Sequence, residues 1–217
     1  MSIKIISSEE FKKRFSYSME KFNEFYWAVA WAGQEFDISK RLISHYRNKI
    51  KRMVVGLHFY QTHPNFIKKV INVSEVKFIK QPEGTFHTKT YIFYNNKTDW
   101  TAFVGSANFT NAAFTENTET IVMIKNENED VLSSIMSVVD TNWNLARSFT
   151  GPEFSRYKKI WAKKNLHAKK LQEPFVKSKK DLAEAAVKDM SWQEFIEGVK
   201  KDKHGYRGRI EMLHKAK

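Results

Sequence analysis

Blocks of apolar and polar residues alternate along the first two thirds of the chain with the periods of helices and strands. Amphipathic stretches predict helices at 7–22, 37–49 and 129–147, with Ser7 and Asp37 as caps of the first two, and one more helix that begins at 62–64. Apolar runs bounded by turn residues predict strands at 25–32, 52–57, 76–79, 89–95, 101–105 and 118–125. Strand–helix alternation followed by consecutive strands predicts an α/β fold, in which a mixed β-sheet is sandwiched by helices.

The pattern changes at Gly151-Pro152, beyond which every block is typical of a helix. Helices are predicted over 153–171, 178–189 and 191–201. We therefore predict a domain at 1–150 that holds the sheet and a small helical C-terminal extension at 151–217. Residues 209–214 still have a helical pattern without a terminating signal, which is what a fragment of a longer protein would show.

Charge is distributed unevenly between these two parts. The formal net charge is +13; residues 1–150 hold 19 Lys+Arg and 15 Asp+Glu, for +4, and residues 151–217 hold 18 and 9, for +9. Single lysine runs are usual on solvated helix faces. So strong a bias over the whole chain nevertheless favours a polyanionic partner, because neutralising phosphates releases condensed counterions. Charge by itself does not distinguish nucleic acid from an anionic membrane.

Composition excludes several kinds of chemistry. The chain has no cysteine, so disulfides, thiolate metal sites and thiol catalysis are ruled out. The apolar run at the N-terminus is too short for a signal peptide, and no stretch reaches the roughly 18–20 apolar residues that a membrane span needs. We expect a soluble, cytoplasmic protein without a membrane partner.

A histidine and a lysine two residues apart lie at the start of the predicted strand at 89–95. His87 and Lys89 would project from the same face of an extended segment, so that an imidazole and an ammonium group point at one spot. Such a pair suits reaction at a phosphoryl group, because that reaction uses a nucleophile or an acid next to a cation. The spacing alone is weak, and His167 and Lys169 match it again in a basic helical stretch, which we attribute to chance.

A turn that begins 16 residues after Lys89 contains Gly105, Ser106 and Asn108. Its exposed backbone N–H groups, hydroxyl and amide would suit the non-bridging oxygens of a phosphate. The glycine would let the backbone approach the phosphate closely, because it carries no Cβ. Glu119 completes the series, in the sequence Asn-Thr-Glu.

The combination His-x-Lys, Gly-Ser-x-Asn and Asn-x-Glu resembles the signature of the phospholipase D superfamily. The order of predicted elements over residues 7–147 is similar to that of the family's fold. One position departs from the pattern, because the aspartate often found five residues after the lysine is Tyr94 here. The metal-independent restriction endonucleases and related nucleases of the family are similar in dispensing with this aspartate, so the departure favours the nuclease branch.

The resemblance implies a mechanism that needs no metal and no cofactor. His87 would attack phosphorus to give a covalent phosphohistidine, which water then hydrolyses. Lys89 and Asn108 would hold the phosphate oxygens and stabilise the trigonal-bipyramidal transition state. Glu119 would accept a hydrogen bond from the imidazole and fix its orientation, and Ser106 would touch the phosphate.

The same mechanism needs a second imidazole, which protonates the leaving oxygen. The chain holds one complete motif, and in family members of this kind two subunits each supply one histidine. The resemblance therefore implies a homodimer with a shared active site. The small size, the single motif and the basic balance favour nucleic acid as the substrate, and DNA is favoured over RNA.

Two other functions stay open: a phospholipase D-type lipid phosphodiesterase and a non-catalytic DNA-binding module. DNA is favoured but not established against RNA, and the sequence does not reveal sequence specificity or pathway. Glu119 could equally be a strand residue that faces solvent, and the aromatic run at 25–31 is interpreted as core. Five further histidines lack metal-ligand spacing and are interpreted as structural: His45, His58, His63, His204 and His214.

Overall fold

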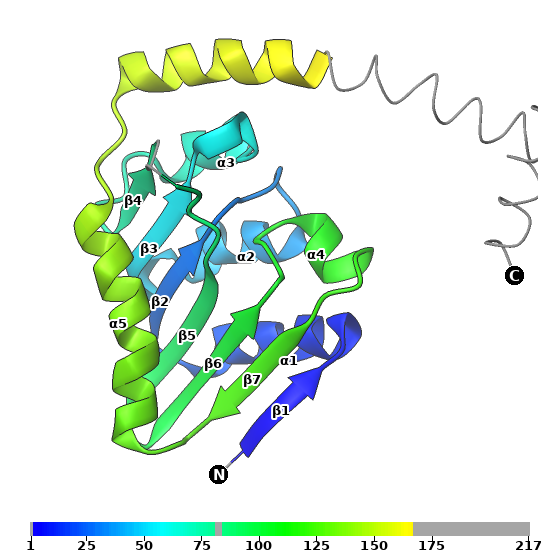
Figure 1. The fold of residues 1–217 in the computed structure, drawn as a ribbon, viewed down its shortest axis with the longest axis vertical. Coiled ribbons are helices and arrows are strands. Elements are labelled where there is room, and N and C mark those ends of the chain that lie inside the picture. Colours follow the sequence, from blue (N-terminus) through cyan, green and yellow to red (C-terminus); the bar gives the residue numbers. More distant parts are fainter. Residues whose placement is uncertain (1, 81–83, 167–217) are drawn as a thin grey trace, which may run out of the picture. The chain divides into compact units, whose positions relative to one another are not determined.

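The computed structural model describes residues 2–80 and 84–166. Within that range, seven strands form one sheet in the order β1-β7-β6-β5-β2-β3-β4 (Figure 1). The strands are β1 (Ser2–Ile6), β2 (Glu24–Val29), β3 (Ile50–Gly56), β4 (Val76–Ile79), β5 (Lys89–Asn96), β6 (Asp99–Gly105) and β7 (Ile121–Lys125). β2, β3 and β4 pair in parallel and the other pairings are antiparallel, so the sheet is mixed, as predicted.

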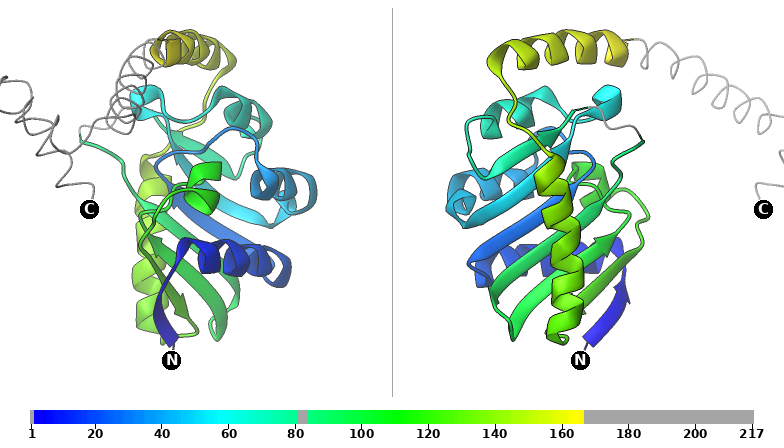
Figure 2. Two further views of the ribbon diagram at one scale, coloured as in Figure 1. Left: turned by 90° about the vertical axis from the view of Figure 1, so that its right-hand side faces the viewer. Right: turned by 60° about the vertical axis from the view of Figure 1, so that its left-hand side comes forward.

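Helices cover both faces of this sheet. The longer ones are α1 (Ser8–Lys21), α2 (Asp37–His45), α3 (Pro64–Val70), α4 (Asn111–Thr115) and α5 (Glu129–Leu145), with short 3-10 turns at Arg47–Lys49 and His58–Tyr60. Figure 2 shows α1, α2 and α4 on one face and α5 on the other. Each face has its own apolar core, which contains Phe11 and Phe15 under α1, and Leu132 and Val139 under α5. The predicted fold class, a mixed sheet sandwiched by helices, is confirmed.

Strand β2 contains an unbroken apolar run that begins at Phe25, and burial on both faces of the strand explains it. Phe25 and Trp27 point into the core under α1, where the rings of Phe15 and Trp27 lie 5.2 Å apart. Ala28 points into the opposite core under α5. Both faces of the strand are buried, so no alternation with polar residues remains. Phe25 and Trp27 are core residues, as predicted.

Local sequence signals, such as capping residues and prolines, predicted where most of the helices begin. The Ser7 side chain caps α1 by accepting a hydrogen bond from the Glu10 N–H at 3.2 Å, and His63 caps α3 in the same way, before a proline at the first helical position. The prediction for α2 was off by one residue. Its N-cap is Phe36, whose N–H donates to the Ser39 hydroxyl at 2.9 Å, and Asp37 is the first helical residue.

One strand and one α-helix were not predicted. Strand β1 lies at the sheet edge, and three of its five residues are exposed, so its sequence shows no buried face. Helix α4 has only five residues, too few to show a helical period.

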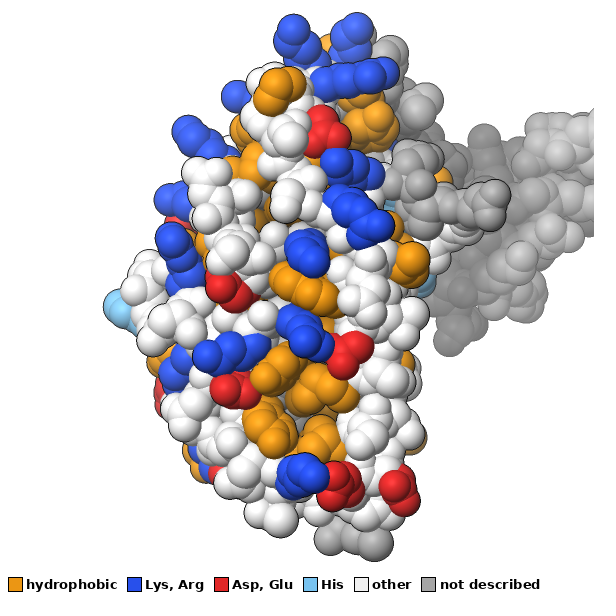
Figure 3. Space-filling model, turned by 90° about the vertical axis from the view of Figure 1, so that its left-hand side faces the viewer, with side chains coloured by type: hydrophobic (Ala, Val, Ile, Leu, Met, Phe, Trp, Pro, Cys, Tyr) orange, Lys and Arg blue, Asp and Glu red, His pale blue; other side chains and the backbone are white. Residues whose placement is uncertain are grey.

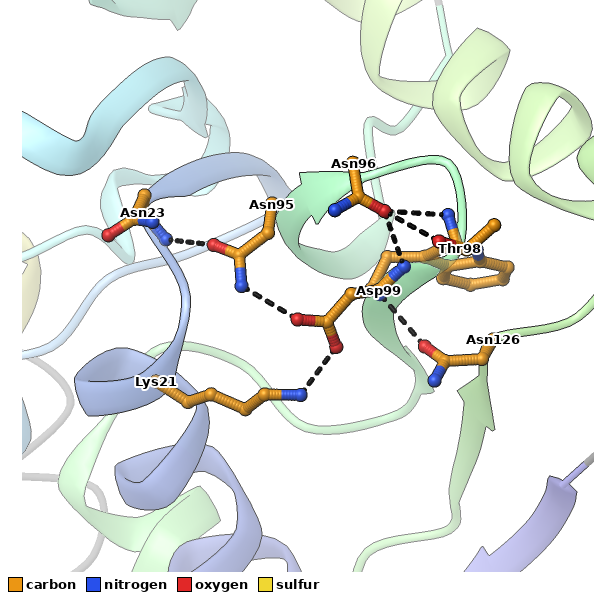
Figure 4. Close-up of polar contacts among 8 residues, drawn as sticks. Lys21, Asn23, Asn95, Asn96, Thr98, Asp99 and Asn126 are labelled. Carbon is orange, nitrogen blue, oxygen red and sulfur yellow. Dashed lines mark hydrogen bonds and ion pairs between the residues drawn. The ribbon is translucent and has the colours of Figure 1, made fainter.

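A polar network closes the β5–β6 hairpin at one end of the sheet (Figure 4). The Asn96 side-chain oxygen accepts hydrogen bonds from the Thr98 N–H at 2.9 Å and the Asp99 N–H at 3.0 Å, which fixes the turn. The Asp99 carboxylate accepts a hydrogen bond from Asn95 at 2.8 Å and pairs with Lys21 at the end of α1. These contacts join α1 to the hairpin, at the end of the sheet opposite to Lys89 and Gly105.

Residues 151–166 are helical. Tyr157 is buried, and its hydroxyl donates to the Thr62 carbonyl oxygen at 2.7 Å. Glu153 pairs with Lys80 at 2.5 Å. A compact unit ends at Lys164 and so includes most of this helix. The helices predicted at 178–189 and 191–201, and the second His-x-Lys match, lie outside the described residues.

Candidate active site

The predicted site residues gather at one end of the sheet because of how the strands run. β5 is antiparallel to both neighbours, so its first residue, Lys89, pairs with Val29 at the end of β2. Gly105 at the end of β6 pairs with Ile121 at the start of β7. The His-x-Lys, Gly-Ser-x-Asn and Asn-x-Glu segments, which are separate in sequence, therefore enter or leave the sheet at the same end (Figure 1).

His87 and Lys89 share a neighbour in this end of the fold. His87 is exposed, and its ring lies edge-on to the Trp31 ring at 5.1 Å. Lys89 is 4% exposed, its ammonium lies 5.5 Å from the centre of the Trp31 ring, and it donates to the His87 carbonyl oxygen at 2.8 Å. The imidazole and the ammonium therefore border the same indole, as expected for side chains that face one spot.

The surroundings of Lys89 and His87 lower the pKa of both side chains. Burial lowers the pKa of Lys89 to about 8, although the negative charge of Glu119 partly opposes the shift. Partial desolvation by its neighbours, and then the positive charge of Lys89, lowers the pKa of His87 below its usual value. At neutral pH the His87 imidazole is therefore mostly neutral and able to act as a nucleophile, while Lys89 mostly keeps its charge.

The Gly-Ser-x-Asn turn is fixed against the start of β7. The Ser106 N–H donates to the Thr120 carbonyl oxygen at 3.0 Å, and its hydroxyl accepts from the Thr120 N–H at 2.9 Å. A Cβ on Gly105 would lie 2.0 Å from that carbonyl oxygen, so no side chain fits there. The close approach that Gly105 permits in this structure is to the backbone of the neighbouring strand. Asn108 is half-buried, and its buried amide oxygen has no hydrogen-bond partner within the described residues.

Glu119 is held by the same turn. Its carboxylate accepts hydrogen bonds from the Ser106 hydroxyl and from the Asn117 amide at 2.9 Å, and its N–H donates to the Ser8 hydroxyl at 3.1 Å. Within residues 84–166 no hydrogen bond joins this carboxylate to the His87 ring. Its interaction with the His87–Lys89 segment is electrostatic, through the charge of Lys89.

Trp31 and His58 were not recognised as site residues from the sequence. Trp31 lies two residues past the end of β2 and borders both His87 and Lys89. His58 follows β3, is 2% exposed, and its ring lies 5.7 Å from the Trp31 ring. Both follow buried parallel strands, whose carboxyl ends are where sites usually form, and that position was the available signal. No three His, Asp or Glu side chains in the described part of the chain are grouped to hold a metal ion.

Comparisons with known proteins agree with this fold. The model of the NgoFVII restriction endonuclease N-terminal PLD domain matches residues 52–146, the segment that contains every predicted site residue. The crystal structure of Nuc from Salmonella typhimurium, a phospholipase D family member, superposes with a TM-score of 0.53 at 22% sequence identity, over 69% of this chain and 99% of that one. The predicted resemblance to the phospholipase D superfamily is confirmed.

The phospholipase D-like segment thus carries all three motifs, and the predicted enzyme class, a phosphodiester hydrolase of the nuclease kind, agrees with the family that it matches. NucT from Helicobacter pylori also superposes, with a TM-score of 0.49 at 14% identity, over 68% of this chain and 99% of that one. No curated protein matches the sequence significantly.

Proposed function

We propose that the protein is a metal-independent endonuclease that cleaves phosphodiester bonds of nucleic acid through a covalent intermediate on His87. The observation that supports the proposal is that the segments carrying His87, Lys89 and Asn108 enter or leave a phospholipase D-like sheet at the same end. The neutral imidazole is the nucleophile, and the buried ammonium is the cation that a developing phosphorane requires.

The first step breaks the ester bond. A ring nitrogen of His87 attacks phosphorus, the P–N bond forms, and the P–O bond to the leaving nucleotide breaks. Lys89 and the Asn108 amide bind the non-bridging oxygens, whose charge grows in the transition state. A second imidazole donates its proton to the leaving oxygen, so that an alcohol departs and not an alkoxide.

The second step releases the product. Water attacks phosphorus, the P–N bond breaks, and the second imidazole, now neutral, accepts a proton from the water. His87 is regenerated and a phosphate monoester leaves. We propose that the second imidazole is the equivalent histidine of an identical subunit, since one chain carries one complete motif.

Ser106, Gly105 and Glu119 serve this centre by positioning it. The hydrogen bonds of Ser106 to Thr120 and Glu119 hold the turn in place, and Gly105 allows β6 and β7 to come together there. The negative charge of Glu119 keeps the pKa of Lys89 higher than burial alone would leave it. Glu119 therefore helps Lys89 to stay protonated.

The small size, the single motif and the basic balance together favour nucleic acid over lipid as the substrate. Figure 3 shows lysine and arginine side chains crowded toward the upper end of the face that carries α5, with apolar side chains in the lower half. The helical residues 151–166 contain five Lys or Arg and one acidic residue. Within the described residues, no helix is long and apolar enough to cross a membrane. We assign the catalytic domain to residues 1–150 and propose that the basic extension at 151–217 adds affinity for the substrate phosphates.

The proposed function predicts cleavage in the presence of a chelator. Purified protein is incubated with duplex DNA, single-stranded DNA and RNA in excess EDTA, and the products are resolved by electrophoresis. We expect cleavage of DNA at an undiminished rate, because Lys89 and the imidazoles supply the charge that a metal would supply. Cleavage that needs added Mg²⁺ would exclude the metal-free mechanism. Binding without cleavage would favour a non-catalytic DNA-binding module, and hydrolysis of phospholipid vesicles alone would favour a lipid phosphodiesterase.

A shared active site predicts that inactive subunits inhibit the wild-type protein when the two are mixed. A fixed amount of wild-type protein is mixed with increasing amounts of a His87→Ala variant at saturating substrate, after time for subunits to exchange. If each site needs both histidines, one equivalent of the variant should lower activity to about half and nine equivalents to about a tenth, as random pairing in a two-fold dimer requires. Light scattering should give the mass of a dimer. Activity that does not change as the variant is added, or an active monomer, would show that each chain works alone.

A further inference from the structure

The segment between β3 and α3 carries an aromatic side chain in an unusual conformation. Phe59 is 53% exposed, and of the phenylalanines that the structure describes it is the one that is exposed. Its backbone has φ 57° and ψ 9°, and Tyr60 follows with φ 52°. Side chains other than glycine rarely adopt this left-handed region, and such residues persist only where their surroundings hold them.

Contacts on both sides hold this turn. The Tyr60 N–H donates to the Leu57 carbonyl oxygen at 3.2 Å, and the Tyr60 ring packs on Tyr157 at 5.1 Å. Lys164 donates to the Phe59 carbonyl oxygen. The ring of Phe59 is thus kept in solvent by a strained backbone that several other residues stabilise, whereas the other described phenylalanines gain free energy by burial.

The turn lies at the same end of the sheet as the active site. Ring contacts lead from Phe59 to His58 at 5.1 Å, from His58 to Trp31 at 5.7 Å, and from Trp31 to His87 at 5.1 Å. Nucleotides of a stacked single strand follow one another about every 3.4 Å. The path from Phe59 to His87 through these three ring contacts is therefore no longer than a few nucleotides.

Basic side chains lie on the helix that contacts this turn. The helix that supplies Lys164 also carries Arg156, Lys158, Lys159 and Lys163, all exposed. A nucleic-acid strand whose phosphates follow this helix would bring its bases toward Phe59. The combination of a basic surface with an exposed aromatic ring is how single strands are bound without sequence readout, by phosphate contacts and base stacking.

We propose that Phe59 stacks on an unpaired nucleobase of the substrate, a few nucleotides from the phosphate at His87. The proposal rests on the proposed function for its substrate class and adds a subsite to it. Bases inside a duplex are covered on both faces by their neighbours, so a stacking residue outside the duplex requires single-stranded or locally opened nucleic acid. The preferred substrate of this protein is therefore single-stranded at that position.

Binding measurements test the subsite without relying on cleavage. Fluorescence anisotropy with labelled single-stranded oligonucleotides is measured in a His87→Ala background, with Phe59→Ala and Phe59→Trp added separately. We expect Phe59→Ala to weaken binding by about 5- to 150-fold, the range for loss of one aromatic–base stack, and Phe59→Trp to keep it. Tyr17, which is 58% exposed on α1, gives the matched control, and Tyr17→Ala should bind as tightly as the background protein.

Oligonucleotides with one abasic site at successive positions identify the base. One position should weaken binding to the background protein as much as Phe59→Ala does, and should have no effect on Phe59→Ala itself. If Phe59→Ala loses its fold, Phe59→Gly, which adopts the left-handed backbone without strain, takes its place in the same series. Equal affinity of all Phe59 variants, or abasic effects that are the same with and without Phe59, would overturn the subsite. Chelator-resistant cleavage by the wild-type protein would still support the proposed function in that case.

Discussion

Substitution of His87 by alanine is expected to lower the rate of cleavage by about 10⁴-fold or more, the usual loss when a covalent nucleophile is removed. No other imidazole in the described residues replaces it, because the neighbouring His58 is 2% exposed and cannot reach a phosphate in solvent. His87 is itself exposed, so the substitution leaves no cavity. The melting temperature and the affinity for oligonucleotides should both stay near those of the wild-type protein. Single-turnover cleavage assays measure the first quantity, and thermal denaturation and anisotropy measure the others.

The matched control is His45, an exposed histidine on α2. His45→Ala should cleave at the wild-type rate. A His87→Ala protein that is folded and retains more than about one part in a hundred of the activity would show that another group attacks phosphorus.

Replacement of Lys89 by methionine should lower kcat/KM by about 10²- to 10³-fold, which is typical for loss of one group that stabilises a transition-state charge. The same substitution should not lower the melting temperature. Lys89 is buried, and in the described part of the chain no carboxylate lies within ion-pair distance of it, so its charge costs free energy of folding. Methionine has a similar shape and avoids that cost. Loss of stability in step with loss of activity would indicate a structural role.

The pH dependence of kcat/KM separates Lys89 from the imidazoles. The pKa of Lys89 is about 8, so the ammonium is charged below that pH and loses its charge as the pH rises through it. Wild-type kcat/KM, which reports groups of the free enzyme, should fall first as the general-acid imidazole loses its proton. It should fall a second time near pH 8, as Lys89 loses its charge. In Lys89→Arg this fall should move beyond the measurable range, because a guanidinium stays charged. An identical alkaline limb in both proteins would assign it to another group.

Much of the fold followed from local patterns. Strand β4 was predicted with its observed bounds, and the cap at Ser7 and the start of α3 at Pro64 needed only their immediate neighbours. The elements that were missed have no local pattern: β1 is stabilised by pairing with β7, more than a hundred residues away, and α4 is too short to show a period.

The site could be predicted as a set of residues but not as an arrangement. Motif spacing selected His87, Lys89 and Glu119 as candidates, whereas the link between Glu119 and Ser106 depends on the pairing of β6 with β7. Trp31 lies at the end of an aromatic run whose other members are core, and only the direction of β2 places it beside the histidine. The left-handed backbone at Phe59 has no sequence signal, because neither glycine nor asparagine marks it.

The stereochemistry of cleavage at phosphorus tests the central claim most directly. A substrate with one phosphorothioate of known configuration at the cleaved position is hydrolysed in ¹⁸O-labelled water, and the configuration of the chiral product is determined. A phosphohistidine intermediate requires two displacements at phosphorus, each with inversion, so the account predicts overall retention of configuration. Overall inversion would mean that water attacks the diester in a single step, and it would contradict the assignment of His87 as the nucleophile.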